Sequence, residues 1–201
     1  QVLHDTLTGL PNRDLLRERL DRSLQRLQGT SGPQFALLFI DVDRFKVIND
    51  SLGHQAGDIV LIEVARRFES CVRDRDIVAR LSGDEFAVLL EQAETLDTAT
   101  RVAQRIIESI TQPMSILDTT LQPSVSIGIA LADVHYRNAD DLLRDADAAM
   151  YRAKRLGRNR SEVFGEEMRA EAMRLLDLEA DLRRAIMHDA FEPHFQPILR
   201  L

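Results

Sequence analysis

The sequence predicts a mixed α/β (α+β) fold of ferredoxin-like type, in which helices pack against a central, mainly antiparallel sheet. Two patterns lead to this class: helical and strand-like segments interleave along the chain, and most of the strands come as hairpins. The predicted order is helix, strand, helix, helix, hairpin, helix, hairpin, helix, strand. With 201 residues, of which 44% are hydrophobic and 29% charged, the chain can form one good core plus an appendage.

The first two elements are a helix and a buried strand. Asn12 is placed to cap a helix that runs from Asp14 to about Gln28. The leucines of its buried face fall at helical spacing: Leu15, Leu16, Leu20, Leu24 and Leu27. The near-continuous apolar run from Gln34 to Asp41 predicts a central strand that is covered on both faces.

The rest of the first 165 residues follows the same periodic rules. The predicted elements are helices at 45–50 and about 56–72, a hairpin formed by 76–81 and 86–90, a helix at 95–110, a Pro113-interrupted pair of strands, a strand at 123–130, and a helix from 140 to about 156. Gly157 is well placed to end the last of these helices.

Two acidic turns stand at the ends of predicted strands. Asp84 and Glu85 lie at the tip of the first hairpin, and Asp41-Val42-Asp43 ends the buried strand. Each turn alone reads as a set of solvated turn formers. Brought together, the two turns would make an oxygen-rich pocket of the type that hard divalent cations prefer, with Asp41, the Val42 carbonyl and Asp84 as candidate ligands.

A basic run, Lys154-Arg155-Leu156-Gly157-Arg158, ends the last predicted helix. Such a run is typical of a helix C-terminus, where cations interact favourably with the helix dipole. Opposite an acidic metal site it would also serve as a clamp for a triphosphate. The sequence leaves both interpretations open.

Composition excludes several classes of function. A formal net charge of -7 argues against a general nucleic-acid binder, because affinity for a phosphate backbone comes from clustered Lys and Arg. The single cysteine, Cys71, cannot form an intrachain disulfide and reads as a small core residue rather than a reactive thiol. The apolar runs are much shorter than the roughly 18 residues of a membrane span, so we expect a cytoplasmic segment without membrane contact, from a parent protein that could itself be membrane-tethered.

The character of the chain changes after residue 165. We expect a charged connector helix at 166–189, followed at 190–201 by the first strand of a second, truncated domain. The chain lacks an initial Met and begins and ends abruptly, so we expect a piece of a longer protein.

Five motifs, in order, resemble the GGDEF domain, the diguanylate cyclase family, over roughly residues 5–164. They are Asp5-x-Leu7-Thr8-Gly9-Leu10-x-Asn12-Arg13; Asp41-x-Asp43-x-Phe45-Lys46-x-x-Asn49-Asp50-x-x-Gly53-His54-x-x-Gly57-Asp58; Ser82-Gly83-Asp84-Glu85-Phe86; Ser126-Ile127-Gly128-Ile129-Ala130; and Ala146-Asp147-x-Ala149-Met150-Tyr151-x-Ala153-Lys154-x-x-Gly157-Arg158-Asn159. The resemblance implies the palm fold of nucleotide cyclases. It also implies condensation of two GTP molecules to cyclic di-GMP and pyrophosphate by a homodimer, each subunit holding half of the site.

The resemblance also implies roles for individual residues. The implied metal ligands for Mg²⁺ (or Mn²⁺) are Asp41, the Val42 carbonyl and Asp84, and the implied catalytic pair is Asp84 with Glu85, the latter as general base. The implied GTP-binding residues are Asn49 and Asp58 for guanine, and Lys154, Arg158 and the backbone amides near Arg44 and Phe45 for the phosphates.

A further implied site would bind the product as an inhibitor. Arg73 and Asp76 stand ahead of the signature turn in an Arg-x-x-Asp pattern that resembles the family's inhibitory site for cyclic di-GMP. From composition alone the same residues read as a solvated charge run, but their spacing from Ser82 favours the inhibitory site.

Ser82 departs from the family pattern, which has glycine at this position. A glycine there would serve a positive φ or a close approach of the backbone to the nucleotide, whereas serine restricts the backbone and adds a hydroxymethyl group. We therefore expect metal and GTP binding to tolerate Ser82 better than turnover does.

The tail from Phe191 to Ile198 resembles the opening strand of an EAL domain, the phosphodiesterase family that opens cyclic di-GMP. Three functions follow as hypotheses: an active diguanylate cyclase, a weak or inactive GTP-binding regulatory module for a downstream EAL phosphodiesterase, and a plain dimerisation scaffold. The scaffold is the least favoured, because it would not need the nucleotide-binding residues together with both carboxylate turns.

Overall fold

The computed structural model describes residues 3–27, 35–93, 95–165, 167–168 and 184–186. The chain divides into two units, Gln1–Phe164 and Gly165–Leu201, and all the strands of the described part lie in the first unit. The expected connector helix at 166–189 lies mostly, and the expected strand at 190–201 entirely, outside the described residues, so both stay predictions. Within the described part, no helix is both long and apolar enough to cross a membrane.

A five-stranded sheet forms the centre of the first unit, in the order β2-β3-β1-β6-β7. Its strands are β1 Ala36–Val42, β2 Ile77–Ser82, β3 Glu85–Leu90, β6 Val125–Leu131 and β7 Arg160–Val163. Only the β6–β7 pair is parallel among these neighbours, and the other three pairs are antiparallel. Every residue of the central strand β1 is buried, which confirms the prediction of a strand covered on both faces.

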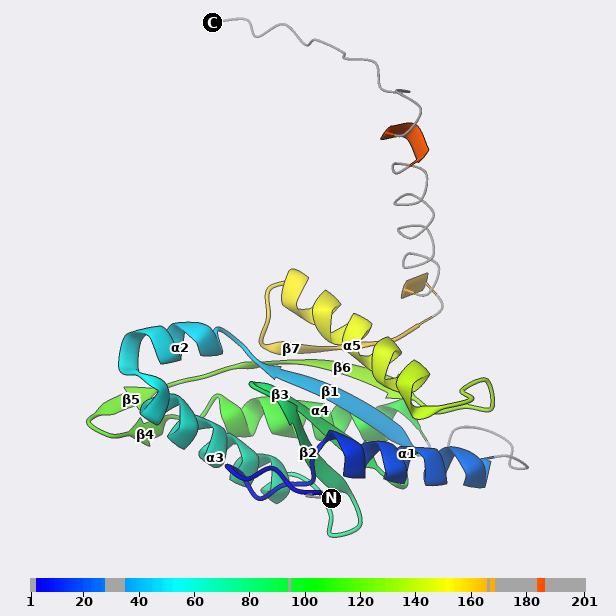
Figure 1. Cartoon of the computed structure of the whole chain (residues 1–201), viewed down its shortest axis with the longest axis horizontal. Coiled ribbons are helices and arrows are strands. Elements are labelled where there is room, and N and C mark those ends of the chain that lie inside the picture. The colour runs from blue at the N-terminus through cyan, green and yellow to red at the C-terminus, as the bar shows by residue number, and fades with distance from the viewer. Residues whose placement is uncertain (1–2, 28–34, 94, 166, 169–183, 187–201) are drawn as a thin grey trace, which may run out of the picture. The chain divides into compact units, whose positions relative to one another are not determined.

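Five helices flank the sheet, and a small hairpin stands apart from it. The helices are α1 Arg13–Leu27, α2 Phe45–Leu52, α3 His54–Ser70, α4 Leu96–Ile110 and α5 Ala139–Arg155; the hairpin consists of β4 Met114–Ile116 and β5 Thr119–Leu121. In Figure 1, α2 and the β4–β5 hairpin lie at the same end of the domain. The mixed α/β class with a mainly antiparallel sheet is therefore confirmed.

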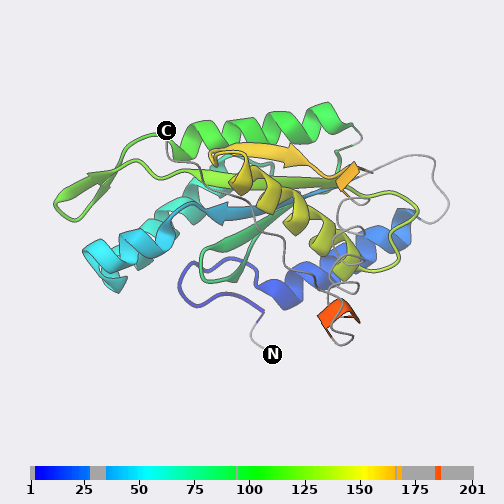
Figure 2. The same ribbon diagram turned by 90° about the horizontal axis from the view of Figure 1, so that it is seen from above.

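The sheet separates two apolar cores because successive side chains of a strand point to opposite faces. Leu38, Ile40 and Val42 of β1 belong to the core under α3 and α4. Leu37 and Phe39 belong to the core under α1 and α5. Figure 2 shows α4 and α5 on opposite sides of the sheet.

Helix α5 approaches the sheet closely over Gly128 of β6. A Cβ atom at this position would lie 1.9 Å from the Ala146 carbonyl oxygen and 2.2 Å from the Met150 amide nitrogen. Contacts below 3.0 Å are essentially never made by real Cβ atoms, so the glycine permits this packing. The position of α5, and of the polar side chains on it, therefore depends on Gly128.

The C-terminus of α5 closes with a left-handed turn. The Gly157 amide donates to the Lys154 carbonyl (3.4 Å) and the Arg158 amide to the Ala153 carbonyl (3.0 Å), which is the pattern of a Schellman motif. Gly157 has φ 116°, which agrees with its predicted role as helix terminator. Two non-glycine residues continue the left-handed conformation, Arg158 at φ 63° and Asn159 at φ 47°.

Candidate active site

At one end of the sheet, the neighbouring strands β3, β1 and β6 carry polar side chains in place of the apolar ones found farther along the same face. Asp41 of β1 is opposite Glu85 of β3 on one side and opposite Ser126 of β6 on the other. Paired residues of antiparallel strands share a face, so these polar side chains continue the face on which Leu37 and Phe39 pack under α5. The two acidic turns of the sequence thus meet at the same end of the sheet.

Asp41 is buried and paired with a lysine. Its Oδ2 lies 2.7 Å from the Lys154 Nζ, and its side chain is 10% exposed. Burial raises the pKa of Asp41 to about 6; the hydrogen bond from Lys154 lowers it, and the charges of Asp84 and Asp43 raise it. A carboxylate kept in this acidic setting favours a cation, either the ammonium of Lys154 or a metal ion.

The signature turn connects β2 to β3 and touches the end of β1. The Val42 amide donates to the Asp84 carbonyl at 3.2 Å, so the two acidic turns are in direct contact. The left-handed residue of the turn is Gly83, with φ 49°, whereas Ser82 belongs to β2. The Ser82 hydroxyl donates to Glu85 Oε2 at 2.9 Å. The expected need for a positive φ thus applies to the second position of the signature and not to Ser82.

Arg80 connects the signature turn to the N-terminal turn. Its Nε and Nη2 donate to the Gly83 carbonyl at 2.9 and 2.8 Å. Its Nη1 donates to both carboxylate oxygens of Asp5, at 3.2 and 3.0 Å. The Arg80 side chain is 12% exposed. Sequence reasoning assigned no role to Arg80, although Asp5 belongs to the first of the five motifs.

The residues expected to read guanine lie on α2 and α3. Asn49 sits on α2, and its Oδ1 is buried without a hydrogen-bond partner among the described residues. Gly57 of α3 makes room for it, since a Cβ there would lie 1.9 Å from the Asn49 Oδ1. Asp58, next to Gly57, is exposed. An unsatisfied amide oxygen is an acceptor available to a ligand that can donate a hydrogen bond.

Two of the residues expected to hold phosphates, Arg44 and Arg158, line a surface cavity. The cavity measures about 340 Å³, and its lining includes Arg44, Gly157 and Arg158. Arg44 has φ 57° and precedes the N-terminus of α2, where Phe45 begins the helix. Lys154 and Phe45 are not among the lining residues, and Lys154 pairs with Asp41.

Asp43 has a different use from that of Asp41. Its carboxylate accepts hydrogen bonds from the hydroxyls of Ser124 and Ser126 and from the Asn159 amide. Its residue is 5% exposed. The second carboxylate of this acidic turn is therefore part of the fold around the cavity.

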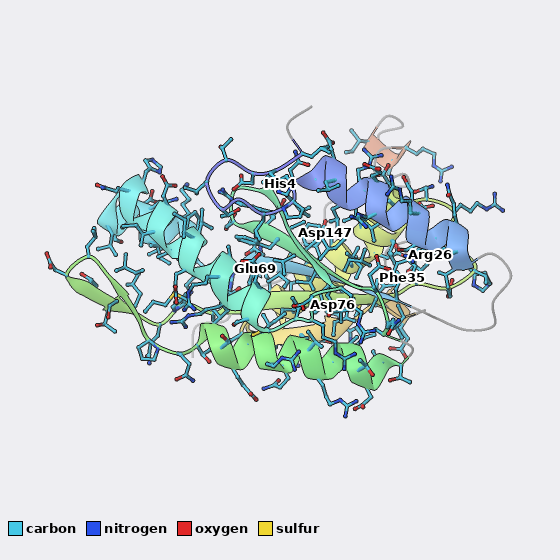
Figure 3. All side chains as sticks on the ribbon, turned by 90° about the horizontal axis from the view of Figure 1, so that it is seen from below. His4, Arg26, Phe35, Glu69, Asp76 and Asp147 are labelled. Carbon is cyan, nitrogen blue, oxygen red and sulfur yellow. The ribbon has the colours of Figure 1, made fainter. Side chains whose placement is uncertain are left out.

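The expected inhibitory residues, Arg73 and Asp76, lie just before β2, at the opposite end of that strand from the signature turn. The Asp76 carboxylate, labelled in Figure 3, accepts from the amides of Arg73 (3.0 Å) and Glu91 (3.2 Å). A cavity of about 320 Å³ is lined by Arg73 and Asp76 together with Arg101 and Arg105 of α4. The two α4 arginines were not expected from sequence, since they are about 30 residues away along the chain.

A further carboxylate, Asp147, belongs to helix α5 and is labelled in Figure 3. Burial raises the pKa of Asp147, and the charge of Glu85 raises it further, while Lys154 and Arg13 lower it. Asp147 is thus close enough to Glu85 and Lys154 to influence the charge of the site. The seven-residue spacing from Asp147 to Lys154, two turns of one helix, is the sequence signal that could have identified it.

The donor set fits a hard divalent cation that keeps water and phosphate ligands. Among the described residues, no three His, Cys, Asp or Glu side chains gather as a complete metal cage. Mg²⁺ commonly binds through one or two carboxylates plus substrate phosphates. Asp41 with Asp84, whose charges already interact, supply that smaller set.

Comparison with known proteins agrees with this architecture. The family model described as "Diguanylate cyclase, GGDEF domain" matches residues 2–160. The bifunctional diguanylate cyclase/cyclic di-GMP phosphodiesterase MucR of Pseudomonas aeruginosa is 45% identical over 196 residues, which cover 98% of this chain and 28% of MucR. The chain spans between 25% and 36% of the length of MucR and two other curated relatives.

Solved structures give the same result. The GGDEF domain of TpbB from Pseudomonas aeruginosa superposes with a TM-score of 0.79 at 45% identity, covering 85% of this chain and 99% of that one. The GGDEF domain of DgcB from Caulobacter crescentus, solved in complex with c-di-GMP, has a TM-score of 0.74 at 30% identity, covering 81% and 93%. This chain therefore belongs to the GGDEF domain family, the diguanylate cyclases.

Proposed function

We propose that this domain is an active diguanylate cyclase that condenses two GTP molecules into cyclic di-GMP and pyrophosphate with Mg²⁺ (or Mn²⁺). The observation that carries the proposal is the convergence of Asp41, Glu85 and Lys154 beside the signature turn, at one end of the sheet. A scaffold would gain nothing from a buried carboxylate whose pKa is raised to about 6 beside a second acidic turn.

Asp41, the Val42 carbonyl and Asp84 would hold the metal. When bound, the cation would neutralise triphosphate charge and lower the pKa of the attacking 3′-hydroxyl. Lys154, now 2.7 Å from Asp41, would then be released toward the phosphates. The fold thus keeps the two charges compensated until metal and nucleotide replace the ion pair.

GTP would bind across α2, α3 and the end of α5. Asn49 and Asp58 would read guanine, the Asp58 carboxylate accepting from the N1 and N2 donors that adenine lacks as a pair. Gly57 supports the Asn49 side chain, whose buried Oδ1 has no partner among the described residues. Lys154, Arg158 and the amides near Arg44 and Phe45 would hold the β- and γ-phosphates.

Each new bond joins two nucleotides. The 3′-oxygen of one GTP attacks the α-phosphorus of the other, a P–O bond forms, and pyrophosphate leaves with the pair of electrons of the broken bond. Glu85 would take the hydroxyl proton as general base. One domain would hold one GTP, so turnover would need a homodimer in which the two GTP sites face each other.

Arg73 and Asp76 would form an inhibitory site for the product. Arg101 and Arg105 line the same cavity and add positive charge suited to the two phosphates of cyclic di-GMP. Binding of c-di-GMP by the GGDEF domain of DgcB supports a product site in the family. Arg73→Ala should relieve product inhibition and leave the initial rate unchanged; a variant that is inhibited like the unmodified chain would count against the site.

The alternative is a GTP-binding regulatory module for a downstream EAL phosphodiesterase. One observation favours it: Ser82 replaces the first glycine of the signature. Such a module would bind GTP through the same residues without forming product.

One assay separates these two functions. The purified chain is incubated with GTP and Mg²⁺, and cyclic di-GMP is sought by chromatography, with ATP as the control substrate. Asp84→Ala should abolish the product, whereas Asp118→Ala, in an exposed turn, should not. If GTP binds but no dinucleotide forms, even from Ser82→Gly, the cyclase proposal fails and the regulatory module is favoured.

A further inference from the structure

We infer that Asp43 is a positioning residue for the phosphate clamp, acting by holding the turn that carries Arg158. The inference rests on the proposed function, because it assigns Arg158 to the phosphates of GTP. It concerns a carboxylate whose role is neither metal binding nor contact with the nucleotide.

Asp43 joins three segments that meet at the cavity of about 340 Å³ lined by Arg44 and Arg158. Its Oδ2 accepts from the Ser124 hydroxyl at 2.6 Å and from the Asn159 amide at 3.1 Å. Its Oδ1 accepts from the Ser126 hydroxyl at 2.7 Å. Its own amide donates to the Ser124 carbonyl at 2.9 Å. With three donors on two oxygens and 5% exposure, this carboxylate has most of its acceptor capacity used within the domain.

The contact with Asn159 matters because the backbone there is strained. Arg158 and Asn159 have φ values of 63° and 47°, a left-handed conformation that non-glycine residues adopt only when their surroundings compensate. The Schellman hydrogen bonds of α5 hold the start of this turn, and the pairing of Arg160 with Ser126 begins the β6–β7 ladder after it; between the two, the Asp43 carboxylate accepts from the Asn159 amide. The direction of the Arg158 side chain follows from the backbone that Asp43 holds.

Geometry separates Asp43 from its neighbour Asp41. Asp41 pairs with the ammonium of Lys154, which a cation can replace. Asp43 instead accepts from two hydroxyls and a backbone amide, which belong to the folded chain and do not leave when ligand arrives. Two carboxylates two residues apart, Asp41 in β1 and Asp43 in the turn after it, therefore have separate roles, one toward metal and one toward the turn that carries Arg158.

The test compares nucleotides that differ in phosphate chain length. Equilibrium binding of GTP and GMP to the full 201-residue chain is measured with Ca²⁺ in place of Mg²⁺, to slow turnover. Asp43→Ala should weaken GTP binding about tenfold, the effect of losing a charge-assisted hydrogen bond. GMP binding should stay unchanged, because GMP has no β- or γ-phosphate. Equal losses for GTP and GMP would mean a general structural role and would overturn the inference.

A double-mutant cycle shows whether Asp43 acts through Arg158. The variant with both Asp43→Ala and Arg158→Ala should bind GTP as weakly as Arg158→Ala alone. Losses that multiply would overturn the inference. Asp43→Asn keeps an oxygen for the Asn159 amide and should restore GTP binding to within about twofold of the unmodified chain. An Asn variant as weak as the Ala variant would also count against the positioning role.

Asp145 provides the matched control. It is also 5% exposed, and it accepts from the Tyr136 hydroxyl at 3.0 Å, away from the cavity. Asp145→Ala should lower the melting temperature without changing the ratio of GTP to GMP affinity. If Asp43→Ala does not melt cooperatively, Asp43→Glu is measured in its place. The longer carboxylate should also displace the turn and lower the ratio of GTP to GMP affinity. Failure of the unmodified chain to bind GTP would overturn the proposed function itself, whereas intact GTP selectivity in Asp43→Ala or Asp43→Glu would overturn only this inference.

Discussion

The two acidic turns of the domain are built differently. The turn after β1 ends the central, fully buried strand, and its carboxylates are held by Lys154, Ser124, Ser126 and Asn159. The signature turn between β2 and β3 carries exposed Ser82 and Gly83 and is held mainly by the Arg80 guanidinium and the Val42 amide. The first turn has buried carboxylates held by side chains and a backbone amide, whereas the second is an exposed hairpin tip between two paired strands.

The difference indicates that the two turns have separate roles. Asp41 lies where the fold already tolerates a buried charge, so its position changes little when ligands arrive. Asp84 lies on the turn, which should adjust to metal and nucleotide, and Glu85 begins β3 directly after it. Three substitutions would break or sharpen this contrast.

The largest expected effect is that of Asp41→Asn, which separates stability from function. Loss of the proposed metal ligand should reduce cyclic di-GMP formation by about 100-fold or more. The metal-free variant should nevertheless be more stable near pH 7.5, by on the order of 1 kcal/mol.

The raised pKa of Asp41 explains why the Asn variant should be more stable and not less. This pKa is raised from 3.8 to about 6, so the folded chain holds a proton that the unfolded chain releases between these values. Stability therefore falls as pH rises from about 3.8 to 6, and the neutral Asn avoids that loss. Thermal melts in EDTA at pH 7.5 and pH 3.5 measure the difference in stability between Asp41→Asn and the unmodified chain, with Asp118→Asn as control. A variant less stable than the unmodified chain at pH 7.5 would mean that the pair with Lys154 dominates.

A smaller effect is expected from Arg80→Ala, which loosens the signature turn. The Gly83 carbonyl loses two donors, and Asp5 loses its cationic partner. Cyclic di-GMP formation should fall about tenfold, with a loss of about 1.5–3 kcal/mol in stability. Arg80→Lys should rescue only part of the rate, because one ammonium cannot replace a planar, five-donor guanidinium.

Arg17→Ala is the control for this experiment. Arg17 forms an ion pair with Asp140 in which both side chains are largely exposed, so its loss should change neither rate nor melting temperature measurably. A rate for Arg80→Ala equal to that of Arg17→Ala would show that the signature turn keeps its position without the guanidinium.

The smallest effect is expected from Ser82→Gly, which restores the family pattern. Ser82 does not occupy a left-handed conformation, so glycine relieves no strain and removes only the hydrogen bond to Glu85. The rate should change by less than about threefold, and stability should fall by about 0.5–1 kcal/mol because of the added backbone freedom. Ser115→Gly, at the exposed middle residue of β4, controls for the backbone effect. A rise in rate well above threefold would mean that the serine itself restrains turnover.

Hydrophobic periodicity predicted the elements well, because burial on one or both faces decides strand and helix here. The leucines of α1 and the apolar run of β1 are examples, and their bounds lie within two residues of those expected. Periodicity does not give register, however, and register places Glu85 beside Asp41. The uses of Asp43 and Arg80 depend on hydrogen-bond partners 75 or more residues away in the chain, which no local pattern reveals.

The N-terminal turn also covers one border of the sheet. β2 and β7 are the outermost strands, and the Arg80 amide of β2 donates to the Pro11 carbonyl at 2.9 Å. β7 has four residues and carries the ion pair of Arg160 with Glu162. Capped, short and charged borders discourage strand addition between copies. Two copies of this domain would thereby be left to associate through faces and turns, as the proposed reaction between two bound nucleotides would require.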